Sequence, residues 1–230
     1  MNKSSAEQSS FGRSLEEEAN LGRDIYFAPK YFERTQLFSQ AAQINAIHGF
    51  GVREILEIGP GNGFAAEFLR AAGYKVDTVD VNLELNPTFV GSVLELDQIV
   101  APYSYDLVVC CEVLEHLPFA SFPTALNQIA KATRKFAFIT LPQSKKFLFS
   151  LSGLLTVPSR GSRWFCFAPS LGRKNPIYEN HHWELGWKPE HRISKICEIM
   201  SEKFHVEKVN AEPMNPYHVF FKLAVKHDSR

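Results

Sequence analysis

The sequence has no net charge, little cysteine and no long apolar run, and each of these absences excludes a class of protein. Its 25 basic and 25 acidic residues cancel, which argues against a DNA-binding protein with a basic face. Four scattered cysteines form no disulfide framework or zinc motif, so we expect a reducing, cytoplasmic environment. The longest apolar run, Phe147 to Val157, is interrupted by serine and glycine and is too short to cross a bilayer. The polar start also lacks the apolar core of a signal peptide.

The composition is that of a folded globular protein. With 230 residues, 45% of them hydrophobic, the chain fits one domain, which we place over residues 21–230. Residues 1–20 are rich in Ser, Glu and Gln and predict a flexible tail. Aromatic residues gather between Tyr26 and Phe32, ahead of an expected helix over residues 33–48. We favour packing of this helix on a sheet over the alternative that it closes over a ligand. Its apolar face would consist of Leu37, Ala41, Ile44 and Ile47.

The most informative stretch runs from Glu54 to Phe64, where a short apolar run leads into Gly59, Gly61 and Gly63. This pattern predicts a strand, a tight turn and the start of a helix. Glycine lets a ligand approach the backbone closely, and the helix start presents unpaired N–H groups to that ligand. Glu57 beside the turn would repel a pyrophosphate but would suit a cationic sulfonium or amino group. The glycine spacing also differs from the G-x-G-x-x-G of dinucleotide oxidoreductases.

Strands and helices alternate after this turn. The next strand, over residues 75–79, ends at Asp80, ~20 residues beyond the glycines, where a carboxylate can accept hydrogen bonds from both ribose hydroxyls of a nucleoside. The alternation predicts a doubly wound α/β sheet, and the last two strands predict an antiparallel hairpin at its edge. The remaining main elements are expected as strands at 105–111, 136–141, 206–209 and 218–225 and as helices at 122–133 and 190–203.

The segment from Val52 to Pro142 resembles the class I S-adenosylmethionine-dependent methyltransferases. The matching motifs are ILEIGPGNG, VDTVD and YDLVVCCEVLEHLP. The resemblance implies a Rossmann-like, mainly parallel seven-stranded sheet with an antiparallel last strand, and S-adenosylmethionine as cofactor. Many relatives carry Asp just before the adenine-binding position, where this chain has Ser92. With Glu57, the implied cofactor-binding residues are Gly59, Gly61 and Asn62 at the methionine end, Asp80 at the ribose and Val93 near the adenine.

A second group of residues follows the strand at 105–111, at the edge of the sheet where ligands bind. Glu112, Glu115 and His116 can bind one divalent cation, and His181 can complete the set. Methyltransferases of small-RNA 2′-hydroxyl ends and ubiquinone-pathway O-methyltransferases resemble the chain at this Glu-x-x-Glu-His segment. The resemblance to the RNA methyltransferases implies a bound divalent cation, Mg²⁺ or Mn²⁺ in this chain. Such a cation would lower the pKa of an acceptor hydroxyl. Alternatively no metal is bound, and His116 or His181 acts as a catalytic base.

The stretch from Gln143 to Tyr178 carries six basic residues, no acidic residue and many aromatic ones. We expect a substrate lid over residues 143–189, in which Arg160, Arg163 and Trp164 contact a sugar, a nucleotide or a lipid-linked phosphate. The alternative is a solvated loop whose aromatic residues fill the core beneath it. Three other histidines have no chemical neighbours in the sequence and are interpreted as ordinary surface or strand residues: His191, His205 and His218.

Together these features predict a methyltransferase that uses S-adenosylmethionine to methylate a hydroxyl of a sugar, a glycan or another polar small molecule. Methylation of an RNA end is a second hypothesis, which the neutral charge weakens. A non-catalytic S-adenosylmethionine-binding protein and an NAD-type oxidoreductase are hypotheses of other classes. The cluster of carboxylates and histidines argues against the first of these, and the glycine spacing argues against the second.

Overall fold

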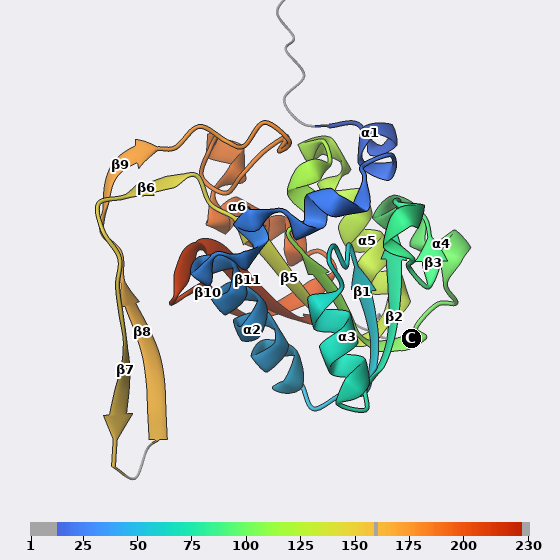
Figure 1. Cartoon of the computed structure of the whole chain (residues 1–230), viewed down its shortest axis with the longest axis horizontal. Helices are drawn as coiled ribbons and strands as arrows, with labels where there is room; N and C mark the ends of the chain where they lie inside the picture. The colour runs from blue at the N-terminus through green and yellow to red at the C-terminus, as the bar shows by residue number, and fades with distance from the viewer. Residues whose placement is uncertain (1–12, 159–160, 227–230) are drawn as a thin grey trace, which may run out of the picture.

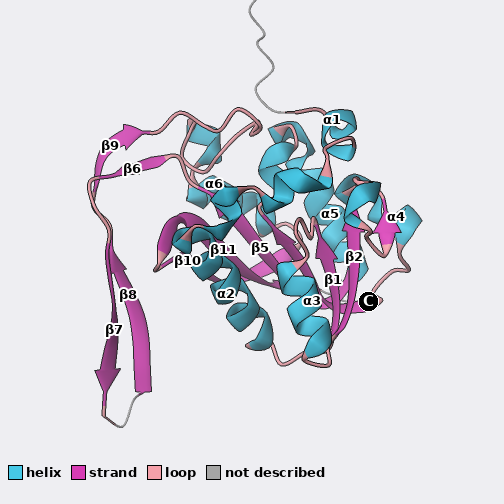
Figure 2. Cartoon of the chain, viewed as in Figure 1, coloured by secondary structure: helices cyan, strands magenta, loops and turns pink. Residues whose placement is uncertain are grey.

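A seven-stranded sheet forms the centre of the molecule in the computed structural model, which describes residues 13–158 and 161–226 (Figures 1 and 2). The strand order is β10-β11-β5-β4-β1-β2-β3. Strands β1 to β5 pair in parallel, whereas β11 runs antiparallel to both β5 and β10. The predicted mainly parallel sheet with an antiparallel last strand is therefore confirmed. Its strands are β1 Glu54–Ile58, β2 Lys75–Asp80, β3 Phe89–Val90, β4 Tyr105–Cys111, β5 Thr133–Pro142, β10 Phe204–Glu212 and β11 Asn215–Val225.

Helices cover both faces of the sheet, because alternate residues of its buried strands point to opposite sides. On β4, Val108 and Cys110 join an apolar cluster with α4, α5 and α6, whereas Leu107 and Val109 join a second cluster with α2 and α3. No helix of the described residues is long and apolar enough to cross a membrane. The α-helices are α1 Leu15–Ala19, α2 Arg34–His48, α3 Phe64–Ala71, α4 Leu96–Ile99, α5 Phe122–Ala132 and α6 Ile193–Met200. The 3₁₀ helices are η1 Arg23–Phe27, η2 Pro29–Phe32, η3 Leu83–Leu85, η4 Val93–Glu95, η5 Leu114–His116, η6 Phe119–Ser121 and η7 Pro189–His191.

Of the flexible tail that we predicted for residues 1–20, residues 1–12 lie outside the described residues, whereas residues 13–20 belong to an ordered N-terminal segment, residues 13–32. Within its described part, helix α1 starts at a capping box, in which the Ser14 hydroxyl accepts from the Glu17 N–H and the Glu17 carboxylate accepts from the Ser14 N–H. The Asn82 amide donates to the Leu21 carbonyl, and the Arg23 N–H donates to Glu84. These contacts tie the segment to the loop that follows β2.

Helix α2 has the predicted length but presents a different face to the protein. Its buried residues are Ser39, Gln43 and Ile47, which lie on one side at intervals of four residues, whereas Leu37 is 38% exposed. Both interpretations of this helix hold in part, because its C-terminal end packs into the apolar core and its N-terminal half lines a pocket.

The segment after β5 extends away from the body instead of folding over it (Figure 1). It begins with β6 Lys145–Phe147, which pairs with β9 Ser170–Lys174. Beyond that pair, β7 Leu151–Val157 and β8 Gly161–Phe167 form a two-stranded antiparallel ribbon. The described residues of 145–174, called the arm below, do not line the pocket, whereas Tyr178, Asn180 and His181 of the lid that we predicted over 143–189 do.

Candidate active site

The turn after β1 has a backbone conformation that requires glycine. Gly59, Gly61 and Gly63 have φ angles of 67°, 54° and 76°, a region that other residues rarely adopt. A Cβ on Gly59 would lie 2.4 Å from Cγ2 of Val113, so the turn also packs too tightly for a side chain there. The Asn62 side chain accepts a hydrogen bond from the N–H of the first residue of α3. The turn thus leaves its backbone open to a ligand at the start of that helix.

One buried carboxyl group, that of Glu57, and one half-buried carboxyl group, that of Asp80, lie beside this turn. Burial raises the pKa of Glu57 to about 7, against a lowering effect of Arg70, and its Oε2 atom has no hydrogen-bond partner. Burial also raises the pKa of Asp80 to about 6, although the Asn82 N–H donates to Asp80 Oδ1 at 2.8 Å. Buried carboxyl groups without a countercharge suit a cationic ligand and hydroxyl donors.

The six predicted cofactor-binding residues surround one pocket of about 760 Å³ at the carboxyl edge of the sheet. Backbone turns supply Gly59, Gly61 and Asn62, while strand ends supply Glu57 and Asp80. Val93 of η4 also lines the pocket, and the preceding Ser92 hydroxyl accepts from the Leu94 N–H and so caps η4. A volume of this size is within the range of roughly 300–1,000 Å³ that is usual for sites binding small organic ligands.

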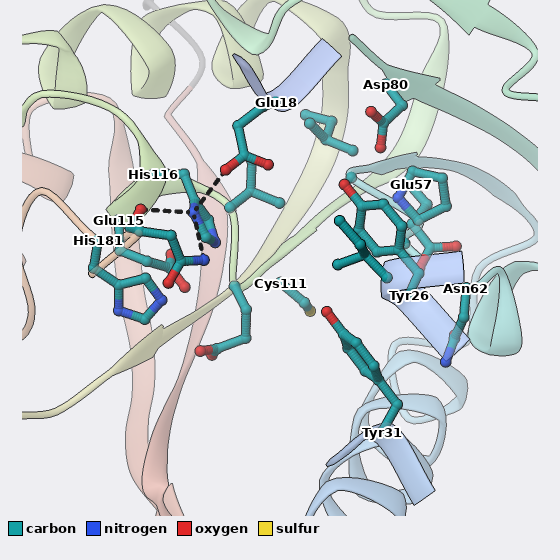
Figure 3. Close-up of a pocket in the computed structure, with 18 of the residues that line it drawn as sticks. Glu18, Tyr26, Tyr31, Glu57, Asn62, Asp80, Cys111, Glu115, His116 and His181 are labelled. Carbon is teal, nitrogen blue, oxygen red and sulfur yellow. Dashed lines mark hydrogen bonds and ion pairs between the residues drawn. The ribbon is translucent and has the colours of Figure 1, made fainter. Parts of the chain in front are cut away.

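The N-terminal segment forms the outer wall of this pocket, a role that we did not predict. Tyr26 lies near the glycine turn, where a Cβ on Gly61 would be 3.6 Å from its ring (Figure 3). Glu18 reaches the opposite side, with Oε1 3.7 Å from His116 Nδ1. The aromatic cluster in the sequence marked this segment, but its position in the fold could not be inferred from composition.

Glu115, His116 and His181 form a candidate metal site on the side of the pocket opposite Glu57 and Asp80 (Figure 3). One potential ligand atom from each lies within 4.8 Å of the others. Both carboxylate oxygens of Glu115 are buried without hydrogen-bond partners, and burial together with neighbouring Glu112 raises the pKa of Glu115 well above its usual value. A divalent cation would supply the missing partner, so this donor set of one carboxylate and two imidazoles fits the group.

Two contacts determine which nitrogen of each imidazole is free. His116 Nδ1 lies 3.1 Å from the Asn180 carbonyl oxygen, which can only accept, so Nδ1 carries the hydrogen and Nε2 keeps its lone pair. His181 Nδ1 lies 3.0 Å from Glu184 Oε1, which leaves the His181 Nε2 atom free in the same way. Burial, together with the adjacent His181, lowers the pKa of His116 to about 3, so this ring is neutral near pH 7.

Glu112 lies outside this group of three, contrary to our prediction of a four-residue metal site. Its backbone has a φ of 55°, and its carboxylate turns toward β5 and β11. The Thr140 hydroxyl donates to Glu112 Oε1 at 2.8 Å, and His218 Nε2 lies 3.4 Å from Glu112 Oε2. His218 Nδ1 in turn lies 2.5 Å from the Ser39 hydroxyl. Glu112, His218 and Ser39 all line the pocket, so interpreting His218 as an ordinary strand histidine was wrong.

Two of the three residues predicted to contact the substrate from the lid, Arg163 and Trp164, lie away from the pocket. Arg163 and Trp164 are on β8 of the arm, and neither lines the pocket. Trp164 is 56% exposed. Arg160 lies outside the described residues. The predicted substrate contacts of Arg163 and Trp164 therefore find no support in their positions.

The strand order, the glycine turn after β1 and the carboxylate at the end of β2 define a Rossmann-like domain of the class I S-adenosylmethionine-dependent methyltransferases. The chain belongs to the methyltransferase domain family, which matches residues 22–191. It is therefore an S-adenosylmethionine-dependent methyltransferase.

Curated relatives share this region at modest identity. The ubiquinone biosynthesis O-methyltransferase of Colwellia psychrerythraea is 30% identical over 182 residues, which cover 71% of this chain and 72% of that protein. The enzyme of the same name from Bordetella parapertussis is 31% identical over 116 residues, 44% of this chain and 48% of its own, so the chain spans about half the length of that relative.

Solved structures share the fold. The N-methyltransferase NodS from Bradyrhizobium japonicum, in complex with S-adenosylhomocysteine, has a TM-score of 0.56 at 13% identity, with 95% of this chain and 100% of that chain covered. Magnesium protoporphyrin IX methyltransferase from Synechocystis, also with bound S-adenosylhomocysteine, has a TM-score of 0.55 at 13% identity, with 83% and 85% covered. At such identities the likeness concerns the fold alone.

Proposed function

We propose that this enzyme methylates a hydroxyl oxygen of a polar small molecule, such as a sugar or glycan, with a divalent cation held by Glu115, His116 and His181. The observation that carries the proposal is the convergence of these three side chains, within 4.8 Å of one another, in the same pocket as the glycine turn. An alcohol is a poor nucleophile near neutral pH, which gives such a cation a chemical purpose. The O-methyltransferase names of the curated relatives also support oxygen as the acceptor atom.

Each part of the pocket has a separate role in this proposal. The Glu57 carboxylate attracts the cationic end of S-adenosylmethionine, while the glycine turn admits it close to the backbone. When bound, a divalent cation would lower the pKa of the acceptor hydroxyl and stabilise its alkoxide. Without a cation, the free Nε2 atom of His116 or His181 can take the hydroxyl proton instead. Alignment of the two substrates in an enclosed pocket contributes to the rate in either case.

One part of the pocket lining can form hydrogen bonds with an acceptor. It includes Ser39, Gln43, Asn215 and Tyr217, whose polar atoms suit an acceptor with several hydroxyls. The Tyr217 hydroxyl donates to Glu184 at 2.9 Å, so the same carboxylate orients both Tyr217 and His181. A polar acceptor is therefore favoured over an apolar one.

The proposal is tested by transfer of a labelled methyl group to a panel of sugars, phenols and RNA ends, with metal removed and restored. We expect EDTA to abolish transfer and Mg²⁺ or Mn²⁺ to restore it. His181→Ala should lower kcat/KM by about 100-fold, consistent with the loss of a group that acts on the reacting oxygen. His205→Ala, at an exposed position on β10, is the matched control and should match the wild type.

Two results would contradict parts of this proposal separately. Full activity in EDTA would eliminate the cation, and loss of activity in His116→Ala or His181→Ala would then identify the base. Preference for an RNA end over every small molecule would refute the acceptor class. Calorimetry with S-adenosylmethionine provides the check on folding, because His181→Ala should bind the cofactor as tightly as the wild type does.

A further inference from the structure

The β7–β8 ribbon of the arm exposes large apolar side chains on both of its faces. Cross-strand pairing places Leu151 opposite Phe167 and Leu155 opposite Arg163 on one face, and Leu154 opposite Trp164 on the other. A Cβ on Gly153 would lie 2.8 Å from the Phe165 ring, so the ring of Phe165 on β8 covers Gly153 on β7. Six large apolar side chains of the ribbon are between 47% and 59% exposed: Leu151, Leu154, Leu155, Trp164, Phe165 and Phe167.

Such a ribbon is poorly stabilised in water. Two strands alone bury little apolar surface, and isolated hairpins are marginally stable. Phe149, which contacts Phe167 edge to face at 6.0 Å, is itself 53% exposed. A concentration of exposed apolar groups on one projecting element indicates a surface that becomes covered in use.

The charge of this region identifies what covers it. Residues 143–178 contain six basic and no acidic residues, whereas the rest of the chain has six more acidic than basic residues. Lys145, Lys146 and Lys174 lie where the arm leaves the body, and Arg163 lies on the ribbon. A basic, aromatic-rich element on an otherwise acidic protein is complementary to an anionic surface that also accepts apolar groups.

We propose that the arm binds the surface of an anionic phospholipid bilayer. The lysines meet the head groups while Leu154, Leu155, Trp164 and Phe165 enter the boundary between head groups and acyl chains. The ribbon lies in this layer and does not cross the bilayer, because its outer backbone groups need water or head groups as partners. Tryptophan and phenylalanine favour this depth, where an aromatic ring meets both polar and apolar surroundings.

Apolar groups on both faces favour a bilayer over a protein partner. A protein, including a second copy of this chain, would cover one face of the ribbon and leave either Trp164 or Phe165 in water. Two arms packed against each other would in addition bring like charges together. A lipid interface surrounds a thin ribbon on both faces.

Flotation of the full chain with vesicles tests this inference. We expect binding to vesicles of phosphatidylcholine mixed with phosphatidylglycerol, weak binding to phosphatidylcholine alone, and loss of binding as salt is added. Loss of one basic residue near the surface weakens binding by roughly fivefold. Arg163→Glu should weaken vesicle binding by more than this, because it replaces a positive charge with a negative one. Trp164→Ser combined with Phe165→Ser should weaken it by at least tenfold. Phe68→Ser removes an equally exposed apolar ring from α3 on the body and should have no effect.

Fluorescence locates the contact within the molecule. Of the three tryptophans, Trp164 is 56% exposed, Trp187 is half-buried on the body and Trp183 is fully buried, so a blue shift on vesicle binding that requires Trp164 comes from the arm. Trp164→Phe should abolish most of that shift while vesicle binding persists. An unchanged thermal midpoint shows that each arm variant remains folded.

Three outcomes would overturn the inference. Equal binding by the wild type and the Trp164→Ser, Phe165→Ser variant would exclude the arm, and no binding to any vesicle would exclude the bilayer. An oligomer that forms without lipid and dissociates in that variant would show that the arm covers a second copy instead. Binding of RNA in preference to vesicles would identify the basic residues as a nucleic-acid surface.

Discussion

Replacing Glu57 by glutamine should make the free enzyme more stable at alkaline pH while weakening its hold on the cofactor. Glu57 is buried, its Oε2 atom has no partner, and its pKa is raised to about 7. In the unfolded chain the same carboxyl titrates near its ordinary value of 4.5. The folded protein therefore binds more protons than the unfolded chain between these two pH values, and its free energy of unfolding falls as pH rises through this window.

The size of the effect follows from the pKa difference. At 1.36 kcal/mol for each pKa unit, the ionised carboxylate lowers the free energy of unfolding by about 3 kcal/mol above pH 7. Glu57→Gln has no carboxylate to ionise at this position. Its free energy of unfolding relative to the wild type should therefore increase by about 3 kcal/mol between pH 4.5 and pH 8. For a domain of this length, such a change corresponds to roughly 6–12 °C in the midpoint of thermal unfolding.

Unfolding by urea at a series of pH values measures the effect, and a neighbour on the same strand provides the control. Glu54 is only partly buried, and hydrogen bonds from Arg134 and Lys75 lower its pKa. Its contribution to stability is therefore present above its unfolded pKa and lost as pH falls, so Glu54→Gln should show a small pH dependence of opposite sign. A pH-independent difference between the wild type and Glu57→Gln would show that the Glu57 carboxyl titrates normally and would refute the reasoning.

Three further outcomes are expected. Gly73→Ala should lower stability by about 1–2 kcal/mol because of its positive φ, and Gly59→Ala should lower it further because its Cβ also clashes with Val113, but only Gly59→Ala should abolish cofactor binding measured by calorimetry. Asp80→Asn should weaken S-adenosylmethionine binding by about 2 kcal/mol, the effect of losing charge-assisted hydrogen bonds to the ribose, and an unchanged Kd would exclude that role. Ser39→Ala removes the partner of His218 and should raise the KM of the acceptor without changing cofactor affinity, whereas an equal change in both would indicate general disruption.

The central fold could be predicted because its signals are local. The apolar run of β4, the three glycines after β1 and the carboxylate at the end of β2 each indicate their structure within a few residues. The parallel order of the strands then brings Glu57, Asp80 and the Glu-x-x-Glu-His segment to one edge of the sheet. The gathering of these residues around one pocket could thus be inferred from the sequence, and their contacts with the cofactor stay a prediction.

His218 was missed as a pocket residue, although the predicted strand direction could have placed it there. Because β11 runs antiparallel to β5, the start of β11 lies at the carboxyl edge of the parallel strands, and His218 pairs with Pro142 there. The antiparallel direction had been predicted, so a histidine near the start of that strand belonged among the candidates. Glu112 failed for a different reason, since its carboxylate is engaged by Thr140 and His218 and no local sequence signal predicts these partners.

The arm could not be predicted because its composition does not distinguish a lid from a projecting ribbon. Apolar and polar residues do not alternate along β7, where Leu154 and Leu155 are adjacent and face opposite sides. A half-buried strand can be recognised in a sequence because apolar and polar residues alternate along it with a period of two. A ribbon with apolar residues on both faces lacks this alternation. Its sequence therefore does not indicate which face is buried until the strand pairing is known.

The N-terminal segment connects the two halves of the site. Its Leu21 carbonyl accepts a hydrogen bond from Asn82, whose N–H donates to the Asp80 carboxylate on the cofactor side. Its Arg13 carbonyl oxygen lies 3.1 Å from the His182 ring, next to His181 on the metal side. A cofactor that draws Asp80 toward its ribose acts on the same loop that holds this segment in place. Because one segment contacts both sides, we expect binding of the cofactor to order the acceptor side as well, which would keep water out of the pocket when the methyl group is transferred.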